Sequence, residues 1–168
     1  MTQRILLHHV RNHAEYRGGL VEIGLTSDLA VFDSKVADVS LAWLNLGTEH
    51  LEDARGALAA NRNWSIYSRS YYAVYNASKA VRYRVKGGVS LHGDDHRKAG
   101  DLPDDFPNVA HWTAVIAEMY AHRLRADYDN WTKTQGEQTI SPNDCIVHAQ
   151  RFLADCADYL RSKFGMVI

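Results

Sequence analysis

The sequence predicts an all-α protein, an antiparallel bundle of four main helices that follows an N-terminal extension. Apolar residues return with the 3.6-residue period of a helix in four long segments between residues 34 and 163. Strand-like runs are too few to form a sheet, and the sequence contains no internal repeat or low-complexity tract. With 168 residues, 46% of them hydrophobic, the chain can bury one core. We therefore expect residues 1–35 to form the extension, of unknown role, and residues 36–168 to form one helical domain.

Charge and cysteine content exclude several classes of protein. The formal net charge of -1 argues against a strong overall attraction to nucleic acid, so any such contact needs a local basic patch. The chain has 2 cysteines, which give no disulfide framework, and its apolar runs fall short of the roughly 20 residues that cross a bilayer. No secretory leader is recognisable. We expect a soluble cytoplasmic protein that has no membrane partner.

The N-terminal extension mixes apolar residues with histidines over residues 4–16, until a Gly-Gly pair ends the segment. This pattern fits either a short helix or a short strand. His9 and His13 are four residues apart, a spacing that can bind a metal on a helix. Because no carboxylate or cysteine motif accompanies them, no metal or other cofactor is expected.

A long amphipathic helix is predicted from about residue 34 to residue 60. Its apolar residues recur at helical spacing with charged residues between them: Val36, Val39, Trp43, Leu46, Leu51, Ala54 and Leu58. Gly47 and Gly56 each weaken a helix by roughly 1 kcal/mol, which allows a break near Gly47. Residues 61–63 are expected to form the following turn.

The next helix, predicted over residues 64–85, is rich in tyrosine and has two faces of different chemistry. Arg69 and Asn76 are seven residues apart and return to within about 20° of each other around the helix. The same stripe is extended by Arg62, Ser65, Lys79 and Tyr83. The other faces carry residues that can pack inward: Trp64, Tyr67, Tyr71, Tyr75 and Val81. Either the polar stripe is a functional surface, or Arg69 is an ordinary surface arginine and the tyrosines only fill the core.

Basic residues gather along this helix and at its end: Arg62, Arg69, Lys79, Arg82, Arg84 and Lys86. They form a local patch for nucleic acid, or those at the end complement the negative pole of the helix dipole. Gly87 and Gly88 are expected to close the helix, because glycine adopts the left-handed conformation at little cost.

The segment from residue 87 to residue 107 is rich in Gly, Asp and Pro, which predicts a long loop with one short helix around residues 92–99. Its histidines, His92 and His96, stand among carboxylates. They could assist at a phosphate group or bind a cation, or they belong to a solvated polar loop.

Helical periodicity returns over residues 108–131, where Arg123 and Asp127 are spaced to form an ion pair on one helix face. Arg125 and Asp129 have the same spacing. From their spacing alone, both pairs are expected to be ordinary ion pairs on the helix surface, worth a few tenths of a kcal/mol.

A final helix is predicted from Ser141 to about Lys163. Ser141 is a good N-cap, and Pro142 suits the first turn of a helix. Cys145 and Cys156 are too far apart along this helix to be bridged and are expected to be buried thiols.

Three segments resemble the HEPN (higher eukaryote and prokaryote nucleotide-binding) family. Residues 71–78 resemble its signature helix, residues 123–129 resemble an Arg-x-x-Ala-Asp-Tyr element of a later helix, and residues 51–54 resemble the start of its leading helix. The resemblance covers roughly residues 40–163. It implies a HEPN-like helical bundle and a homodimer in which two signature helices face each other, so that Arg69 and Asn76 of both chains line one cleft.

The resemblance also implies roles for individual residues. Arg69 and Asn76 take the positions of the family's catalytic pair. Four residues on this helix or just before it are expected to contact nucleic acid: Arg62, Tyr72, Lys79 and Arg82. Three residues of the later helix are expected to support the cleft: Arg123, Asp127 and Tyr128.

Asn76 departs from the pattern of the family's ribonucleases, which have histidine at this position. Asparagine forms hydrogen bonds but does not titrate. General acid–base catalysis typically raises a rate on the order of 10²- to 10⁴-fold, so a ribonuclease with asparagine here should be slow or inert. Another histidine would have to carry the proton; the candidates are His92 and His96, followed by His111 and His122. Ser78 stands where some members carry a tyrosine that a nucleotidyltransferase modifies.

Three functions are compatible with these observations. The first is an RNA- or nucleotide-binding component of a toxin–antitoxin or defence system, with a degenerate ribonuclease motif at Arg69 and Asn76. The second is an active, metal-independent endoribonuclease toxin paired with a nucleotidyltransferase antitoxin. The third is a helical interaction module without a ligand. Whether the chain is an enzyme is left open at this point.

Overall fold

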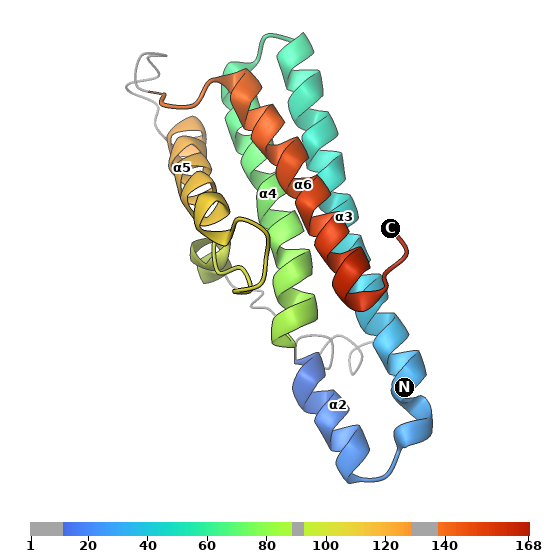
Figure 1. The fold of residues 1–168 in the computed structure, drawn as a ribbon. Helices are drawn as coiled ribbons and strands as arrows, with labels where there is room; N and C mark the ends of the chain where they lie inside the picture. The colour runs from blue at the N-terminus through green and yellow to red at the C-terminus, as the bar shows by residue number, and fades with distance from the viewer. Residues whose placement is uncertain (1–11, 89–92, 129–137) are drawn as a thin grey trace.

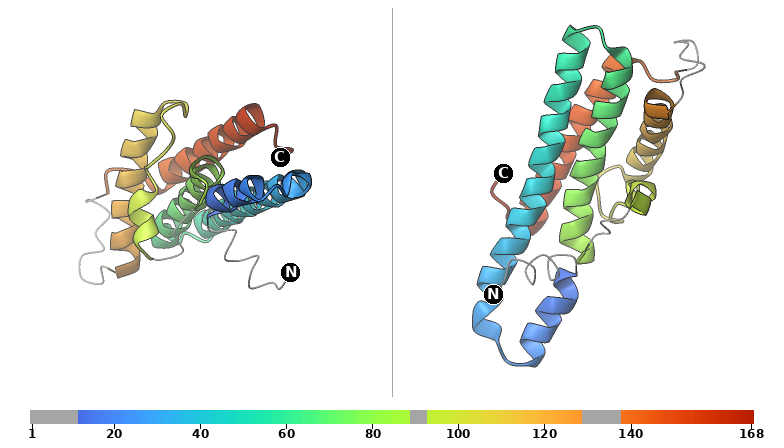
Figure 2. Two further views of the ribbon diagram at one scale, coloured as in Figure 1. Left: turned by 90° about the horizontal axis from the view of Figure 1, so that it is seen from below. Right: turned by 180° about the vertical axis from the view of Figure 1, so that it is seen from behind.

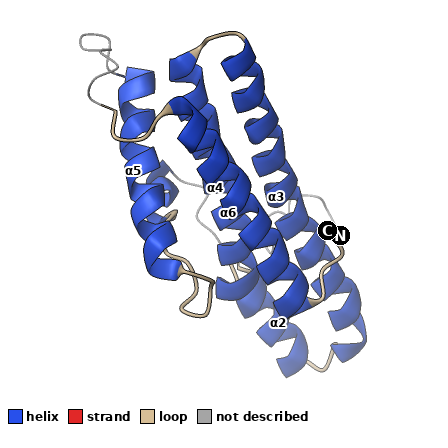
Figure 3. Ribbon diagram, turned by 45° about the horizontal axis from the view of Figure 1, so that its top comes forward, coloured by secondary structure: helices blue, strands red, loops and turns tan. Residues whose placement is uncertain are grey.

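A computed structural model describes residues 12–88, 93–128 and 138–168, and no strand occurs among them. Five α-helices make up most of this part of the chain: α2 (His13–Glu22), α3 (Leu29–Ala59), α4 (Asn63–Lys86), α5 (Val109–Tyr128) and α6 (Pro142–Phe164). Two short 3₁₀ helices, η1 (Thr26–Asp28) and η2 (Gly93–Lys98), lie in the connections. Figure 3 shows the described part of the chain as helices with connecting loops and no strand. The predicted all-α class is confirmed.

Helix α4 is the central element. It packs against α3, α5 and α6, and α6 also packs against α3. Figure 1 shows that α3, α4, α5 and α6 alternate in direction, and the end-on view of Figure 2 shows α4 between its neighbours. Every long helix is therefore in contact with α4, which makes α4 the element that positions side chains from all the others.

The described part of the N-terminal extension, from residue 12, forms a helical hairpin with the first part of α3. Figures 1 and 2 show α2 and the start of α3 projecting beyond the end of α4. A hydrogen bond of 3.1 Å from the Ala14 amide to the Gly87 carbonyl joins α2 to the end of α4. Because α3 is continuous from Leu29, the predicted boundary between residues 35 and 36 lies inside this helix. Residues 1–11, His9 among them, lie outside the described part.

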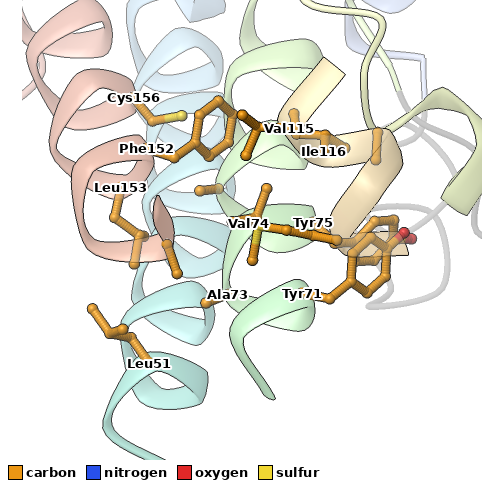
Figure 4. Packing of buried hydrophobic residues seen from close by; sticks show 14 of the residues in the cluster. Leu51, Tyr71, Ala73, Val74, Tyr75, Val115, Ile116, Phe152, Leu153 and Cys156 are labelled. Atoms are coloured by element: carbon orange, nitrogen blue, oxygen red, sulfur yellow. The ribbon is translucent and has the colours of Figure 1, made fainter. Parts of the chain in front are cut away.

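The core lies on both sides of α4. Val74, Ala77 and Ala80 of α4 are completely inaccessible to solvent. In Figure 4, Phe152, Leu153 and Cys156 of α6 pack on one side of α4, while Tyr71 and Tyr75 point to the α5 side. Cys145 and Cys156 are free, buried thiols, and burial raises the pKa of Cys145 to about 12. The rings of Tyr71 and Tyr75 also form part of the core.

Two helix ends agree with the signals in the sequence. Helix α4 ends at Gly87, whose φ of 81° is in the left-handed region. At the start of α6, the Ser141 hydroxyl accepts a hydrogen bond of 3.1 Å from the Asp144 amide, and Pro142 occupies the first turn. Both ends are specified by residues within four positions of the end, which is why the sequence alone predicts them.

Gly47 does not break the long helix. Helix α3 is continuous through it, and a Cβ atom at this position would lie 2.9 Å from the carbonyl oxygen of Ala73 and 3.1 Å from Cδ2 of Leu153. The missing side chain lets α4 and α6 approach α3 closely. The weaker helix propensity of glycine is outweighed by this packing.

Gly47→Ala is expected to lower the free energy of unfolding by about 1–3 kcal/mol, the usual cost of overpacking a close helix contact. Gly56→Ala is the matched control, because a Cβ atom there meets nothing within 4 Å. That control should raise the helix propensity and leave the stability equal or higher. Urea unfolding followed by circular dichroism measures both. A Gly47→Ala variant as stable as the native protein would contradict this account of the α3–α4 contact.

None of the helices in the described ranges combines the length and apolar character needed to span a membrane.

Candidate nucleic-acid interface

Asn76 does not lie on an open surface beside Arg69. Its side chain is in the core, with 3% of the residue exposed, and its Nδ2 donates a hydrogen bond of 2.8 Å to the backbone carbonyl of Tyr72. The shared polar stripe expected for Arg69 and Asn76 therefore does not reach the surface at Asn76. The amide is satisfied within its own helix, because α4 is covered by its neighbours along most of its length.

Arg69 lies instead beside two residues of α3. Its Nη1 is 3.4 Å from Nδ1 of His50 and 3.8 Å from Oδ2 of Asp53. The Arg69 side chain is 47% exposed and that of His50 is 18% exposed. Burial, followed by the charge of Arg69, lowers the pKa of His50, so its imidazole is mainly neutral at pH 7. An exposed arginine thus stands next to a partly accessible, neutral histidine.

Lys79 and Arg82, two of the expected nucleic-acid contacts, are buried. Arg82 Nη1 lies 3.0 Å from Oδ1 of Asp95, and Lys79 Nζ lies 3.4 Å from Oδ2 of the same carboxylate. Tyr75 donates a hydrogen bond of 2.9 Å to Asp95 as well. We call Lys79, Arg82 and Asp95 the buried ion cluster. The two cations are matched to a carboxylate of η2, so Lys79 and Arg82 do not extend the predicted basic patch to the surface. Tyr83, expected on the polar stripe, is likewise buried.

The pKa values in this cluster follow from burial and charge. Burial by itself would raise the pKa of Asp95, but the hydrogen bonds and charge of Arg82, with smaller effects of Tyr75 and Lys79, lower it below the ordinary value. Burial lowers the pKa of Lys79, and Asp95 opposes this effect. The cluster therefore fixes η2 on α4 through an ionised carboxylate.

His96, the next residue of η2, packs among tyrosines. Its ring is stacked on that of Tyr75, with 4.3 Å between the ring centroids, and its Nδ1 is 3.1 Å from the Tyr71 hydroxyl. Burial, then the charge of Arg123, lowers the pKa of His96. His96 was predicted from the sequence as a possible proton carrier, and in the structure it lies against the tyrosine-rich helix α4. His92 lies outside the described residues.

Arg123 of α5 reaches the same place. Its Nη2 donates a hydrogen bond of 2.6 Å to the Tyr72 hydroxyl, and its Nε is 2.8 Å from Oδ2 of Asp127. The guanidinium also lies over the rings of Tyr72 and Tyr128, at 5.2 and 5.1 Å from their centroids. The predicted Arg123–Asp127 ion pair is confirmed, and it holds the guanidinium against Tyr72.

Four partly exposed rings follow one another across this face: His50, Tyr72, His96 and Tyr120. The centroid distances between successive rings are 5.5, 5.8 and 6.3 Å. They come from α3, α4, η2 and α5 in that order. We call these four rings the aromatic strip; Arg69 lies at its His50 end, and Arg123 lies over Tyr72.

The aromatic strip provides two kinds of contact. Planar rings stack on nucleobases or other flat groups, and arginines bind phosphate through charge and directed hydrogen bonds. Arg62 is exposed at the start of α4, two turns before Arg69. Among the described residues, no group of three or more His, Cys, Asp or Glu side chains is placed to hold a metal ion.

No protein-family model matches the chain, and neither the curated proteins nor the solved structures contain a significant match to it.

Proposed function

We propose that this protein is a HEPN-like helical module that binds RNA or a nucleotide on the aromatic strip. The observation that carries this proposal is the succession of four partly exposed rings with Arg69 at one end and Arg123 over Tyr72. These rings come from four separate elements, and two arginines lie beside them.

Energetics support a single-stranded ligand. Stacking of a base on an aromatic side chain is worth about 1–3 kcal/mol and tolerates any base, because every base has a π-face. With a net charge of -1, the chain has no strong overall field for polyphosphate. Binding should therefore depend on the rings and a small number of phosphate contacts, and it should be only moderately sensitive to salt.

Tyr72→Ala is expected to weaken binding of a labelled single-stranded RNA about 5- to 100-fold, the equivalent of one lost stacking contact. Tyr72→Phe is the matched control. It keeps the ring and removes the hydroxyl that Arg123 contacts, so it should retain most of the affinity. Fluorescence anisotropy at low and at physiological salt measures both. Equal affinity of Tyr72→Ala and the native protein, or no binding by the native protein at low salt, would contradict the proposal.

The proposal includes a homodimer and a place in a toxin–antitoxin or defence system with a nucleotidyltransferase partner. Its support is the resemblance of residues 51–54, 71–78 and 123–129 to HEPN elements. Although α3, α5 and α6 cover most of α4, a second copy can meet α4 along the open edge that carries Arg69 and Tyr72. A nucleotidyltransferase gene next to this one would support the pairing.

A second candidate function is metal-independent RNA cleavage on the same surface. The observation that favours it is the distance of 3.4 Å between Arg69 Nη1 and His50 Nδ1. His50 was not among the histidines considered from the sequence, and it offers the titrating group that Asn76 lacks. Arg69 would stabilise charge on the phosphorus oxygens, and His50 would take the proton of the 2′-hydroxyl.

A helical interaction module without a ligand makes the opposite prediction. In that case, Arg69→Ala changes assembly or stability and leaves no ligand affinity to lose. The binding experiment with Tyr72→Ala separates this reading from the proposal.

A further inference from the structure

A groove runs along one face of α2, away from the aromatic strip. Its volume is about 580 Å³. Apolar side chains line it at Tyr16, Leu20, Ile23 and Leu25, and Gly19 leaves its floor without a side chain. Ile23 and Leu25 are 69% and 45% exposed, which is high for residues of this size. The carboxylates of Glu15 and Glu22 stand on its rim.

We infer that this groove is the docking site of the chain's own residues 4–10. This segment carries four apolar side chains, Ile5, Leu6, Leu7 and Val10. The only charged side chains in residues 1–11 are Arg4 and Arg11, both basic, and the same stretch contains His8 and His9. An apolar, basic segment matches an apolar groove with an acidic rim.

The length of the chain allows this docking. Helix α2 has 10 residues and is therefore about 15 Å long. Seven extended residues reach about 23 Å, so residues 4–10 can run back along the whole helix. Asn12, where the described chain begins, itself lines the groove. Because the segment is tethered at the groove, its effective concentration there is of millimolar order, and weak contacts suffice to hold it.

A second copy of the chain is the competing occupant. Val21 and Val31 are also exposed on the projecting hairpin, at 48% and 65%. These two residues do not line the groove, however, and nothing in the groove is complementary to itself, since both rim charges are acidic. The basic segment next to it satisfies those charges, whereas a copy of the same groove does not.

Limited trypsin digestion of the full-length protein tests the inference, because trypsin cleaves after Arg4 and docking shields that bond. Gly19→Trp introduces a large ring at a residue that lines the groove, and its Cβ atom meets nothing within 4 Å. Gly18→Trp is the matched control: Gly18 is equally unobstructed but does not line the groove. Cleavage after Arg4, followed by mass spectrometry, should be about tenfold faster in Gly19→Trp than in the native protein. Gly18→Trp should be cleaved at the native rate.

Leu6→Asp provides an independent variant, because it changes the segment and leaves the groove intact; it too should be cleaved about tenfold faster. Equal cleavage rates of the native protein, Gly19→Trp and Leu6→Asp would overturn the inference. A native rate that rises when the protein is diluted would overturn it in favour of docking between two copies. The RNA affinity is unaffected in either case, so this result is independent of the proposed function.

Discussion

Asp95→Ala is expected to lower the free energy of unfolding by about 3–5 kcal/mol, a large part of the stability of a single domain. The carboxylate is fully buried and lies within 3.4 Å of Lys79 and 3.0 Å of Arg82, whose side chains are 5% and 4% exposed. Removing it leaves two buried cations without a counter-charge and the Tyr75 hydroxyl without its acceptor. Urea unfolding monitored by circular dichroism and tryptophan fluorescence measures the loss.

Asp104→Ala is the control for this prediction, because Asp104 is an exposed carboxylate of the following loop. It should change stability by less than about 0.5 kcal/mol, as surface substitutions usually do. If the free energy of unfolding of Asp95→Ala is within 1 kcal/mol of the native value, with the native m-value, Lys79 and Arg82 are hydrated without the carboxylate. The buried ion cluster would then not hold η2 on α4.

The same cluster predicts the direction of the acid response. The pKa of Asp95 is lower in the folded protein than in the unfolded chain, where it is about 3.9. Its contribution is therefore present above pH 3.9 and is lost as the pH falls through the folded pKa. Between pH 5 and pH 3, the native protein should lose stability more steeply than Asp95→Asn, which cannot titrate at this position.

Local signals explain how far the fold could be predicted from sequence. The caps at Gly87 and Ser141 act within one helical turn, and the apolar period of each helix is a property of its own residues. The continuity of α3 through Gly47 could not be predicted in this way. It depends on the approach of Ala73 and Leu153, which follow Gly47 in the chain by 26 and 106 residues and reach it only in the folded protein.

The candidate site was harder to predict for the same reason. Arg69 and Tyr72 were identified because they share a helix, but the position of Asn76 on the polar stripe gave no sign that α4 is covered there. The sequence predicted that Lys79 and Arg82 would be accessible to a ligand. In the structure they are paired with Asp95 of η2, which follows Arg82 by 13 residues. His50 precedes Arg69 by 19 residues. In a helical hairpin whose turn lies near residues 61–62, residues of the two helices face each other when their residue numbers sum to about 120. This relation could have identified His50 as a neighbour of Arg69 from the sequence alone.

If the second candidate function is correct, purified protein cleaves total cellular RNA in the presence of EDTA, and His50→Ala lowers the rate about 10²- to 10⁴-fold. In this reaction, the 2′-hydroxyl attacks phosphorus, the bond to the 5′-oxygen breaks, and a 2′,3′-cyclic phosphate forms. The leaving 5′-oxygen takes a proton from water and becomes a 5′-hydroxyl. Arg69 turns to the phosphate, which frees Nδ1 of His50 to accept the 2′ proton. Since burial and Arg69 lower the pKa of His50, the rate should fall as the pH drops through that pKa.

Three variants separate this activity from binding alone. Arg69→Ala should lose activity about 10²- to 10³-fold, the usual cost of removing one donor to a developing negative charge. His111→Ala is a matched control, since His111 lies on α5 beside Trp112 and His148 and contacts no member of the aromatic strip. Asn76→His tests the position that the family pattern assigns to catalysis; because Asn76 is buried, we expect it to add no activity. Activity in Asn76→His and not in the native protein would return the catalytic role to that position and leave the native chain as an RNA-binding protein. Cleavage that survives His50→Ala would assign the proton transfer to another group, and His96 would be the first residue to replace.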